Sequence, residues 1–288
     1  MTSQLKITIS EILGLLPEIY SSHARDSATY LLFDKIIKNL IGNSSLTSTT
    51  GLIDLGCFGE VIFPFTEMGA VSSLNLFELD ELIIFSFYWK NRSLYHRSAD
   101  IGANLGLHSI LMSRCGWNVD AYEPDPNHLK LLHRNFELNK IANVNVFEAA
   151  VSDHQGTAEF VRVLGNTTGS HLAGAKQNPY GELEKFSVTL ESINNIFSSV
   201  DFIKMDVEGQ ERTIILATDS EHWKKTDMML EVGSQENASD IFIHLEKLKV
   251  NAFSQKNGWK LVTSLEQIPS SYKEGSLFIS AKDCMPWN

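Results

Sequence analysis

The chain has 288 residues, of which 43% are hydrophobic and 20% charged, and its formal net charge is −11. This length allows one large α/β domain, alone or with a smaller unit. The negative charge argues against a broad binding surface for nucleic acid or for an anionic membrane, so we expect neither as a partner. The three cysteines lie far apart, which fits neither a disulfide framework nor a thiolate metal site.

The protein is expected to act in the cytoplasm. Its first residues lack the basic and apolar stretches of a secretory signal. The longest apolar run, at residues 82–89, is far shorter than the roughly 20 residues that a helix needs to span a bilayer. We therefore predict no membrane span and expect this run to form a buried strand or a short helix.

Residues 1–95 are predicted to form an N-terminal extension that binds the acceptor or a partner. Before residue 42, apolar residues recur at spacings of three and four, which predicts two helices, the first limited by Pro17. Residues 42–51 are rich in turn formers and are expected to form a loop or linker. Residues 52–95 mix short apolar runs with glycines, a pattern typical of short strands and turns.

Residues 96–288 are predicted to form one α/β domain. Short strand-like runs alternate there with amphipathic helical segments, which is typical of a mostly parallel sheet covered by helices on both faces. After Glu123, Asp125 and Pro126 predict the start of a helix. The main strands are expected at 98–101, 118–123, 144–149, 200–206 and 228–232. Further strands are expected at 157–163, 184–188, 260–263 and 276–279.

A candidate cofactor site lies where the strand ending at Asp100 gives way to a helix, which is where open α/β sheets bind ligands. Glycines in the turn let backbone amides approach a ligand closely. Glu123 ends the next strand, where its carboxylate can accept both hydroxyls of a ribose. The pattern therefore predicts a nucleoside-bearing cofactor. Four residues of the turn are expected to contact it: Gly102, Ala103, Asn104 and Gly106.

Asp100 distinguishes between two such cofactors. A pyrophosphate disfavours a fixed anion beside it, whereas the cationic methionine part of S-adenosylmethionine (SAM) attracts a carboxylate. Asp100 therefore favours SAM over a dinucleotide, and the missing Gly-x-Gly-x-x-Gly run also counts against a nucleotide-linked oxidoreductase. The alternative is that Asp100 only caps the next helix and that Glu123 only solvates a strand end.

The sequence resembles the FkbM family of class I methyltransferases between residues 97 and 232. Its most specific matching segment is Ile-Lys-Met-Asp-Val-Glu-Gly at 203–209. The other matching segments are the 100–106 turn with 108–109, 122–124, Asn135, Asn139, 149–153, 169–170, 188–190 and 230–232. The resemblance implies a Rossmann-like, seven-stranded, mostly parallel sheet with an antiparallel last strand. It also implies bound SAM, with Pro124 and Ala149 among its contacts, and methylation of an oxygen on a sugar, polyketide or similar small acceptor.

The candidate reacting groups follow the predicted strand at 200–206. Alternation along a strand puts Lys204 and Asp206 on one face, while Glu208 falls in the turn before Gly209. We assign Asp206 to positioning the cofactor or acceptor and Glu208 to removing the proton of an acceptor hydroxyl. Lys204 has either a chemical role or a structural one, as the partner of an acidic side chain.

Several alternatives stay open. His108 is a rival general base or a core contact, and His171 lies in a loop that either closes over the site or is plain surface. Asp206, Glu208 and Glu231 could instead hold Mg²⁺, but their spacing does not require it, and we expect no metal. The domain could also bind SAM without catalysis, to regulate a partner. The favoured function is O-methylation of a hydroxyl on a small molecule, sugar or glycan.

Overall fold

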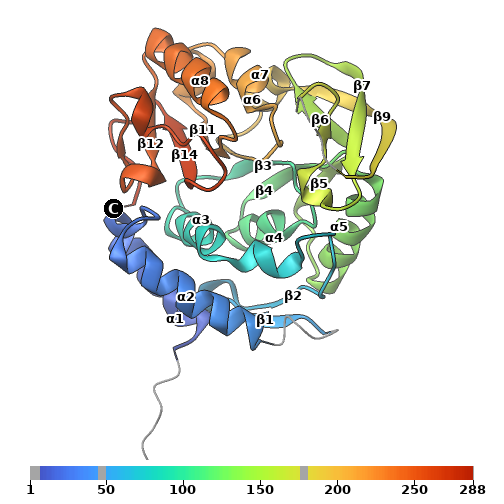
Figure 1. The fold of residues 1–288 in the computed structure, drawn as a ribbon, viewed down its shortest axis with the longest axis vertical. Helices are drawn as coiled ribbons and strands as arrows, with labels where there is room; N and C mark the ends of the chain where they lie inside the picture. The colour runs from blue at the N-terminus through green and yellow to red at the C-terminus, as the bar shows by residue number, and fades with distance from the viewer. Residues whose placement is uncertain (1–6, 45–49, 176–180, 288) are drawn as a thin grey trace, which may run out of the picture.

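The centre of the molecule is a sheet of eight strands with helices on both faces (Figure 1). The computed structural model describes residues 7–44, 50–175 and 181–287. In sheet order the strands are β13 (Lys260–Leu261), β12 (Asn251–Ser254), β14 (Ser276–Ser280), β11 (Asp227–Glu231), β10 (Phe202–Met205), β3 (Arg97–Ile101), β4 (Asn118–Tyr122) and β5 (Val144–Phe147). Neighbours from β11 to β5 run parallel, and β14 is antiparallel to both of its neighbours. This is the predicted α/β, Rossmann-like fold. The short edge strand β13 is added to the seven strands that the family resemblance implies.

Two sets of helices cover the two faces of this sheet. One face packs against α3 (Leu79–Lys90), α4 (Leu107–Arg114) and α5 (Pro126–Leu138). The other packs against α6 (Ile193–Phe197), α7 (Glu211–Leu216) and α8 (Gln235–Leu248). Because both faces are covered, the central strands β10 and β14 bury every residue, as parallel and mixed sheets of this kind do.

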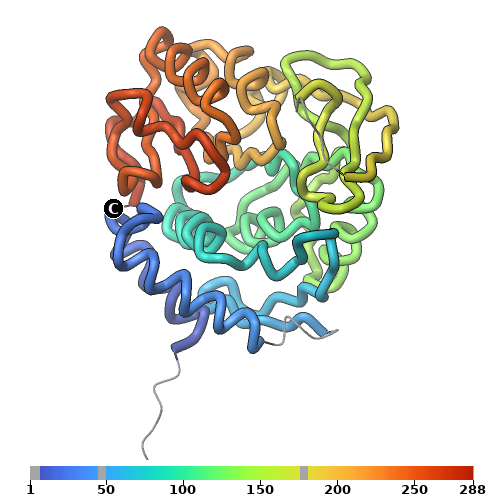
Figure 2. The backbone as a smooth tube through the Cα atoms, in the orientation of Figure 1, coloured from blue at the N-terminus to red at the C-terminus, as the bar shows by residue number. Residues whose placement is uncertain are grey.

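The N-terminal segment lies against the first of these helical layers, outside α3 (Figures 1 and 2). It contains α1 (Ile9–Leu15), α2 (Ala28–Gly42) and a two-stranded sheet of β1 (Leu52–Asp54) and β2 (Glu60–Ile62). The two predicted helices are confirmed, and Pro17 stands near the start of the 3₁₀ helix that follows α1. Parts of the predicted linker and N-terminus, residues 45–49 and 1–6, lie outside the described residues.

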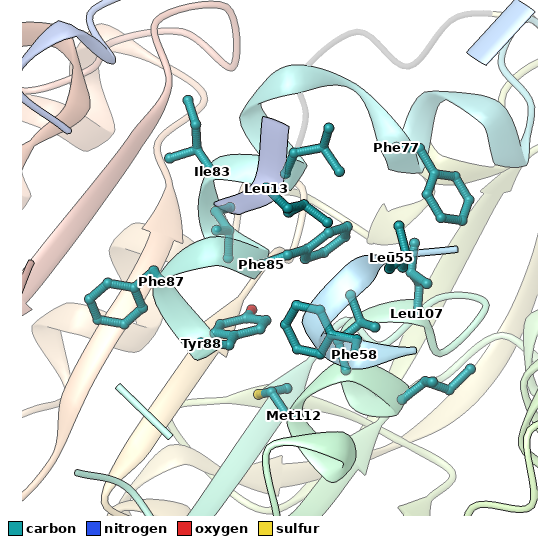
Figure 3. Close-up of a cluster of buried hydrophobic side chains, with 14 of the residues drawn as sticks. Leu13, Leu55, Phe58, Phe77, Ile83, Phe85, Phe87, Tyr88, Leu107 and Met112 are labelled. Atoms are coloured by element: carbon teal, nitrogen blue, oxygen red, sulfur yellow. The ribbon is translucent and has the colours of Figure 1, made fainter. Parts of the chain in front are cut away.

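The apolar run at 82–89 forms helix α3, which is one of the two forms predicted for it. Nearly all of its side chains are buried, because α1 and α2 cover one side of this helix while α4 and the sheet cover the other. Figure 3 shows Phe85 and Tyr88 of α3 beside Leu13 of α1 and Met112 of α4. Residues on both sides of position 96 thus share one hydrophobic cluster. The division of the chain into an N-terminal extension at 1–95 and a methyltransferase domain at 96–288, with different tasks, stays a prediction.

A second sheet of four strands packs beside the main one, in the order β6 (Ala149–Ser152), β9 (Leu183–Ser192), β7 (Gly156–Val163) and β8 (His171–Leu172). The single strand predicted at 144–149 is wrong, because the chain divides at Glu148 and β5 pairs with β4 whereas β6 pairs with β9. The remaining short helices are η1 (Leu16–Ser22), η3 (Gly56–Phe58), η4 (Ser73–Phe77), η5 (Thr167–Gly169), η6 (His222–Lys224), η7 (Gln255–Asn257) and η8 (Leu265–Gln267).

No helix in the described ranges combines the length and the apolar character that crossing a membrane requires. The longest, α2, has 15 residues and carries charged side chains such as Asp34 and Lys38. The prediction that the chain has no membrane-spanning helix therefore holds for these ranges.

A buried histidine joins the N-terminal segment to the end of the sheet. His23 is buried, and its Nδ1 accepts the indole N–H of Trp259 at 3.0 Å. Because an indole N–H only donates, the proton of the neutral ring sits on Nε2, which donates to the Leu16 carbonyl at 3.0 Å. Burial lowers the pKa of His23 to about 4, although the bond to Leu16 opposes this.

We expect this histidine to make the fold sensitive to acid. The unfolded chain binds the proton near pH 6.5 and the folded chain only near pH 4, so protons favour the unfolded state in this interval. At about 1.4 kcal/mol for each pH unit, the free energy of unfolding should fall by about 3 kcal/mol as the pH is lowered from 6.5 to 4. Urea unfolding across this range checks it, with His23→Gln as the control that should flatten the pH dependence. An unchanged slope in that variant would contradict the assignment.

Candidate cofactor and active site

A pocket opens at the carboxyl ends of β3, β4 and β10. Its empty volume is about 630 Å³ when the open solvent at its mouth is included. Part of its wall comes from the second sheet, through Phe160 and Leu172. Seven of the predicted site residues line it: Gly102, Asn104, Glu123, Pro124, Ala149, Asp206 and Glu208.

The glycine turn after β3 is packed between its two neighbouring strands. Gly102 has a φ of +79°, and a Cβ at this position would collide with the carbonyl oxygen of Asp206. The amides of Gly102 and Ala103 both donate to the Tyr122 carbonyl at 3.0 Å. Gly106 has a φ of +84° and stands at the N-cap of α4. The turn therefore needs glycine for its close approach to the end of β10, whereas the predicted approach of its amides to a ligand stays a prediction. Ala103 and Gly106 do not line the pocket.

Glu123 holds this turn in place from the end of β4. One carboxylate oxygen accepts the Asn104 amide at 2.8 Å, and the other accepts the Asp125 amide at 2.8 Å. The oxygen that accepts the Asn104 amide has a second lone pair for a donor such as a ribose hydroxyl, whereas the other oxygen also faces Nδ1 of His128 at 3.7 Å. This buried carboxylate is consistent with the predicted ribose contact, which stays a prediction.

A buried ion pair fixes the second sheet to the start of α5. Asp125 caps α5 by accepting the Asn127 amide at 2.8 Å, and Arg162 of β7 donates to both of its carboxylate oxygens, at 2.7 and 2.5 Å. Burial raises the pKa of Asp125, but the Arg162 guanidinium, His128 and the Asn127 amide together lower it more, so the pKa is lowered. Arg162 was not predicted from the sequence, because a lone arginine in a strand carries no local sign of its partner.

Asp100 lies beneath the glycine turn, not in the pocket wall. It is fully buried, and one carboxylate oxygen accepts the Ser109 hydroxyl at 2.6 Å. Its other oxygen has no hydrogen-bond partner among the described residues, and neither has the side-chain oxygen of the pocket residue Asn104. Buried polar atoms without partners are costly, so a cofactor that brings a donor group fits the pocket at Asn104. Direct contact of Asp100 with SAM stays a prediction.

Lys204 and Asp206 form a close pair at the end of β10. The Lys204 ammonium is buried and lies 3.5 Å from an Asp206 carboxylate oxygen. Burial lowers the pKa of Lys204, but the carboxylates of Asp206 and Asp100 raise it more, so the side chain stays charged. Burial and the nearby carboxylate of Asp206 raise the pKa of Glu231 well above its usual range. This geometry fits the structural alternative for Lys204, which does not line the pocket, while a chemical role stays a prediction.

Neither candidate histidine lines the pocket. The ring of His108 is buried, with Nε2 2.9 Å from a Glu81 carboxylate oxygen and Nδ1 2.8 Å from the Tyr88 hydroxyl. Both contacts belong to α3, so His108 joins the N-terminal segment to α4. His171 is also buried, and its Nδ1 lies 2.9 Å from the Gly169 carbonyl oxygen. Within the described ranges, no three His, Cys, Asp or Glu side chains gather as metal ligands would, and a metal-free reaction stays a prediction.

The N-terminal segment holds one wall of the pocket. Thr167 lines the pocket, and its amide donates to the Met68 carbonyl at 2.9 Å. The Ala70 amide donates to the Gly165 carbonyl at 2.7 Å, and the Thr167 hydroxyl lies 3.1 Å from Nε2 of His128, another lining residue. The loop at 164–170 is therefore fixed by backbone bonds to residues far earlier in the chain.

Replacing Gly69 by Ala should weaken SAM binding about tenfold. Gly69 has a φ of +88°, and a Cβ there would collide with the Gly165 carbonyl, so the loop must shift. Forcing a close-packed contact apart costs typically about 1–3 kcal/mol, which corresponds to roughly tenfold in affinity if the loop is restored on binding. Calorimetry with SAM measures it. Gly116→Ala is the matched control, because Gly116 also has a φ of +88° but open space around it. Equal affinities in both variants would contradict the expectation.

Comparison with known proteins gives the family. The model for the "Methyltransferase FkbM domain" matches residues 100–267, which is more than half of the chain. Methyltransferase sdnD of Sordaria araneosa is 27% identical, and the match covers 43% of this chain and 61% of that protein. Methyltransferase 1 of Beauveria bassiana is 24% identical, with 44% and 60% covered. The chain thus spans about three fifths of the length of these curated relatives.

Among solved structures, the METTL16 MTase domain is similar over 94% of this chain and 92% of its own. Its TM-score is 0.45 and its sequence identity is 12%. At this similarity it has no bearing on the substrate. The family match covers the glycine turn, Glu123 and the Asp206–Glu208 turn, which are also the parts that build the pocket. The chain therefore belongs to the FkbM methyltransferase domain family.

Proposed function

We propose that this protein is a SAM-dependent methyltransferase that methylates a hydroxyl on a small molecule, sugar or glycan in the cytoplasm. The observation that carries the proposal is the pocket in which the glycine turn, Glu123 and the two acids after β10 meet, inside the matched family domain. The buried side-chain oxygen of Asn104, which lines the pocket without a hydrogen-bond partner among the described residues, fits a donor-bearing cofactor and supports it.

Each part of the pocket has a task in this proposal. Glu123 and the glycine turn bind the nucleoside part of the cofactor, and bound SAM would supply an activated methyl group. Asp206, paired with Lys204, positions the reacting groups, and its fixed charge is kept in place by the buried ammonium. Glu208 accepts the proton that an acceptor hydroxyl loses as its oxygen gains the methyl group. The second sheet and the loop at 164–170 close one side of the pocket against water.

The test combines binding with transfer. Calorimetry of the full chain should detect saturable binding of SAM and none of NAD. The protein is then incubated with methyl-labelled SAM and fractionated host metabolites and glycans, and the product that gains label is identified. Label on an oxygen supports the proposal. Binding of SAM without transfer to any fraction would favour the non-catalytic alternative, and absence of SAM binding would reject both.

A further inference from the structure

Glu211, the first residue of α7, is a buried carboxylate with partners from three parts of the chain. One oxygen accepts the Gly209 amide at 2.8 Å and the Tyr272 hydroxyl at 3.2 Å. The other accepts the side-chain amide of Asn237 in α8 at 3.0 Å. Burying a carboxylate is costly, so three bonds directed at one such group indicate that it fixes the geometry around it.

The turn that Glu211 holds has an unusual backbone. Glu208 has a φ of +51°, in the positive region that side chains rarely adopt, and Gly209 has a φ of +109°, which glycine adopts freely. The Glu208 conformation persists only where its surroundings enforce it. The Glu211 bond to the Gly209 amide does so directly. Because Asp206 and Glu208 line the pocket, Glu211 acts on the pocket wall without lining it.

Tyr272 connects this turn to the loop before β14. A Cβ at Gly233, just after β11, would collide with the Tyr272 ring, so the ring lies directly on that backbone. Burial raises the pKa of Tyr272, and the negative charges of Glu211, Glu208 and Asp206 raise it further. Among these three, Glu211 accepts the hydrogen bond of the hydroxyl, at 3.2 Å. The loop before β14 is therefore joined to the candidate base through Glu211.

We infer that Glu211 is a positioning residue of the active site, which fixes the Glu208–Gly209 turn and joins it, through Tyr272, to the loop before β14. The inference rests on the proposed function for what the turn does. Glu211 touches no reacting atom. Its role is to hold a strained pocket wall in the shape that binds the cofactor and presents Glu208.

The experiment measures the affinity of the full chain for SAM and for S-adenosylhomocysteine by calorimetry, together with thermal melting. Glu211→Asp shortens the side chain by one methylene, so its carboxylate no longer reaches the Gly209 amide. The Gly209 amide is then left without its acceptor, which should weaken both ligands about tenfold. Glu211→Gln keeps an acceptor of the same length. Because that oxygen can still accept the Gly209 amide, this variant should bind within about threefold of wild type.

Asn237→Ala is the matched control, because it removes a bond to Glu211 but leaves the Gly209 bond intact. It should lower the melting temperature with little change in affinity. If Glu211→Asp and Asn237→Ala both melt earlier and both bind as wild type does, Glu211 is only structural and the inference is overturned. If wild type itself binds neither ligand, the proposed function fails instead. Should Glu211→Asp not fold, Tyr272→Phe replaces it, because it removes only the hydroxyl that joins Glu211 to the loop before β14. It should weaken both ligands, and wild-type affinity in a folded Tyr272→Phe protein would overturn the inference.

Discussion

Replacing Glu208 by Gln is expected to lower kcat by about one hundred to ten thousand fold, while SAM affinity stays near that of wild type. This is the usual contribution of a general base to a proton transfer. Gln has the same length and shape, so the cost of the positive φ at this position is unchanged. Only the ability to take up the acceptor's proton is lost. The measurement is steady-state kinetics with the acceptor identified by label transfer, alongside calorimetry with SAM.

Glu137→Gln is the matched control for this variant, because Glu137 is exposed on α5 and lies outside the pocket lining. It should leave kcat unchanged. A Glu208→Gln enzyme that turns over within about threefold of wild type would remove the base assignment and leave Glu208 as a wall of the pocket. A parallel loss of SAM affinity would instead point to a binding role.

Replacing Gly102 by Ala is expected to weaken SAM binding by about one hundredfold or more and to lower the melting temperature. The added Cβ would collide with the Asp206 carbonyl, so the glycine turn and the end of β10 must separate. The positive φ costs about 1–2 kcal/mol, and forcing a close-packed contact apart costs typically about 1–3 kcal/mol more. Both segments line the pocket, so the separation changes the site itself.

Gly116→Ala again separates the cost of the positive φ from the cost of the collision. Its φ of +88° imposes a similar backbone cost, but nothing lies within 4 Å of the added Cβ. The control should lose some stability and keep its SAM affinity. If Gly102→Ala bound SAM as tightly as Gly116→Ala, the close approach between the turn and β10 would have no role in the cofactor site.

The strands were predicted well where their burial pattern is strong, as in β3, β4, β10 and β11. β12 was missed because four residues following a helix carry too little pattern. The division of 144–149 into β5 and β6 also escaped prediction. The residues on either side of Glu148 are both strand-like, and only their different partners, β4 and β9, separate them.

The sequence by itself determined the cofactor end of the site. The glycine turn, Glu123 and the segment at 203–209 are short, and the backbone geometry they need is encoded in adjacent residues, so the pattern can be recognised without a structure. All three bring residues to the pocket. Local capping worked in the same way, since Asp125 and Pro126 do begin α5.

Only the tertiary structure decided which distant side chains meet. It directed His108 toward Glu81, joined Arg162 to Asp125 and placed Glu211 behind the turn that carries Glu208. Each contact joins separate elements or depends on how a turn is folded, and a single side chain carries no local record of such a partner. The role of the N-terminal segment was hidden for the same reason, because its bonds to the loop at 164–170 are made by backbone groups, which every residue possesses.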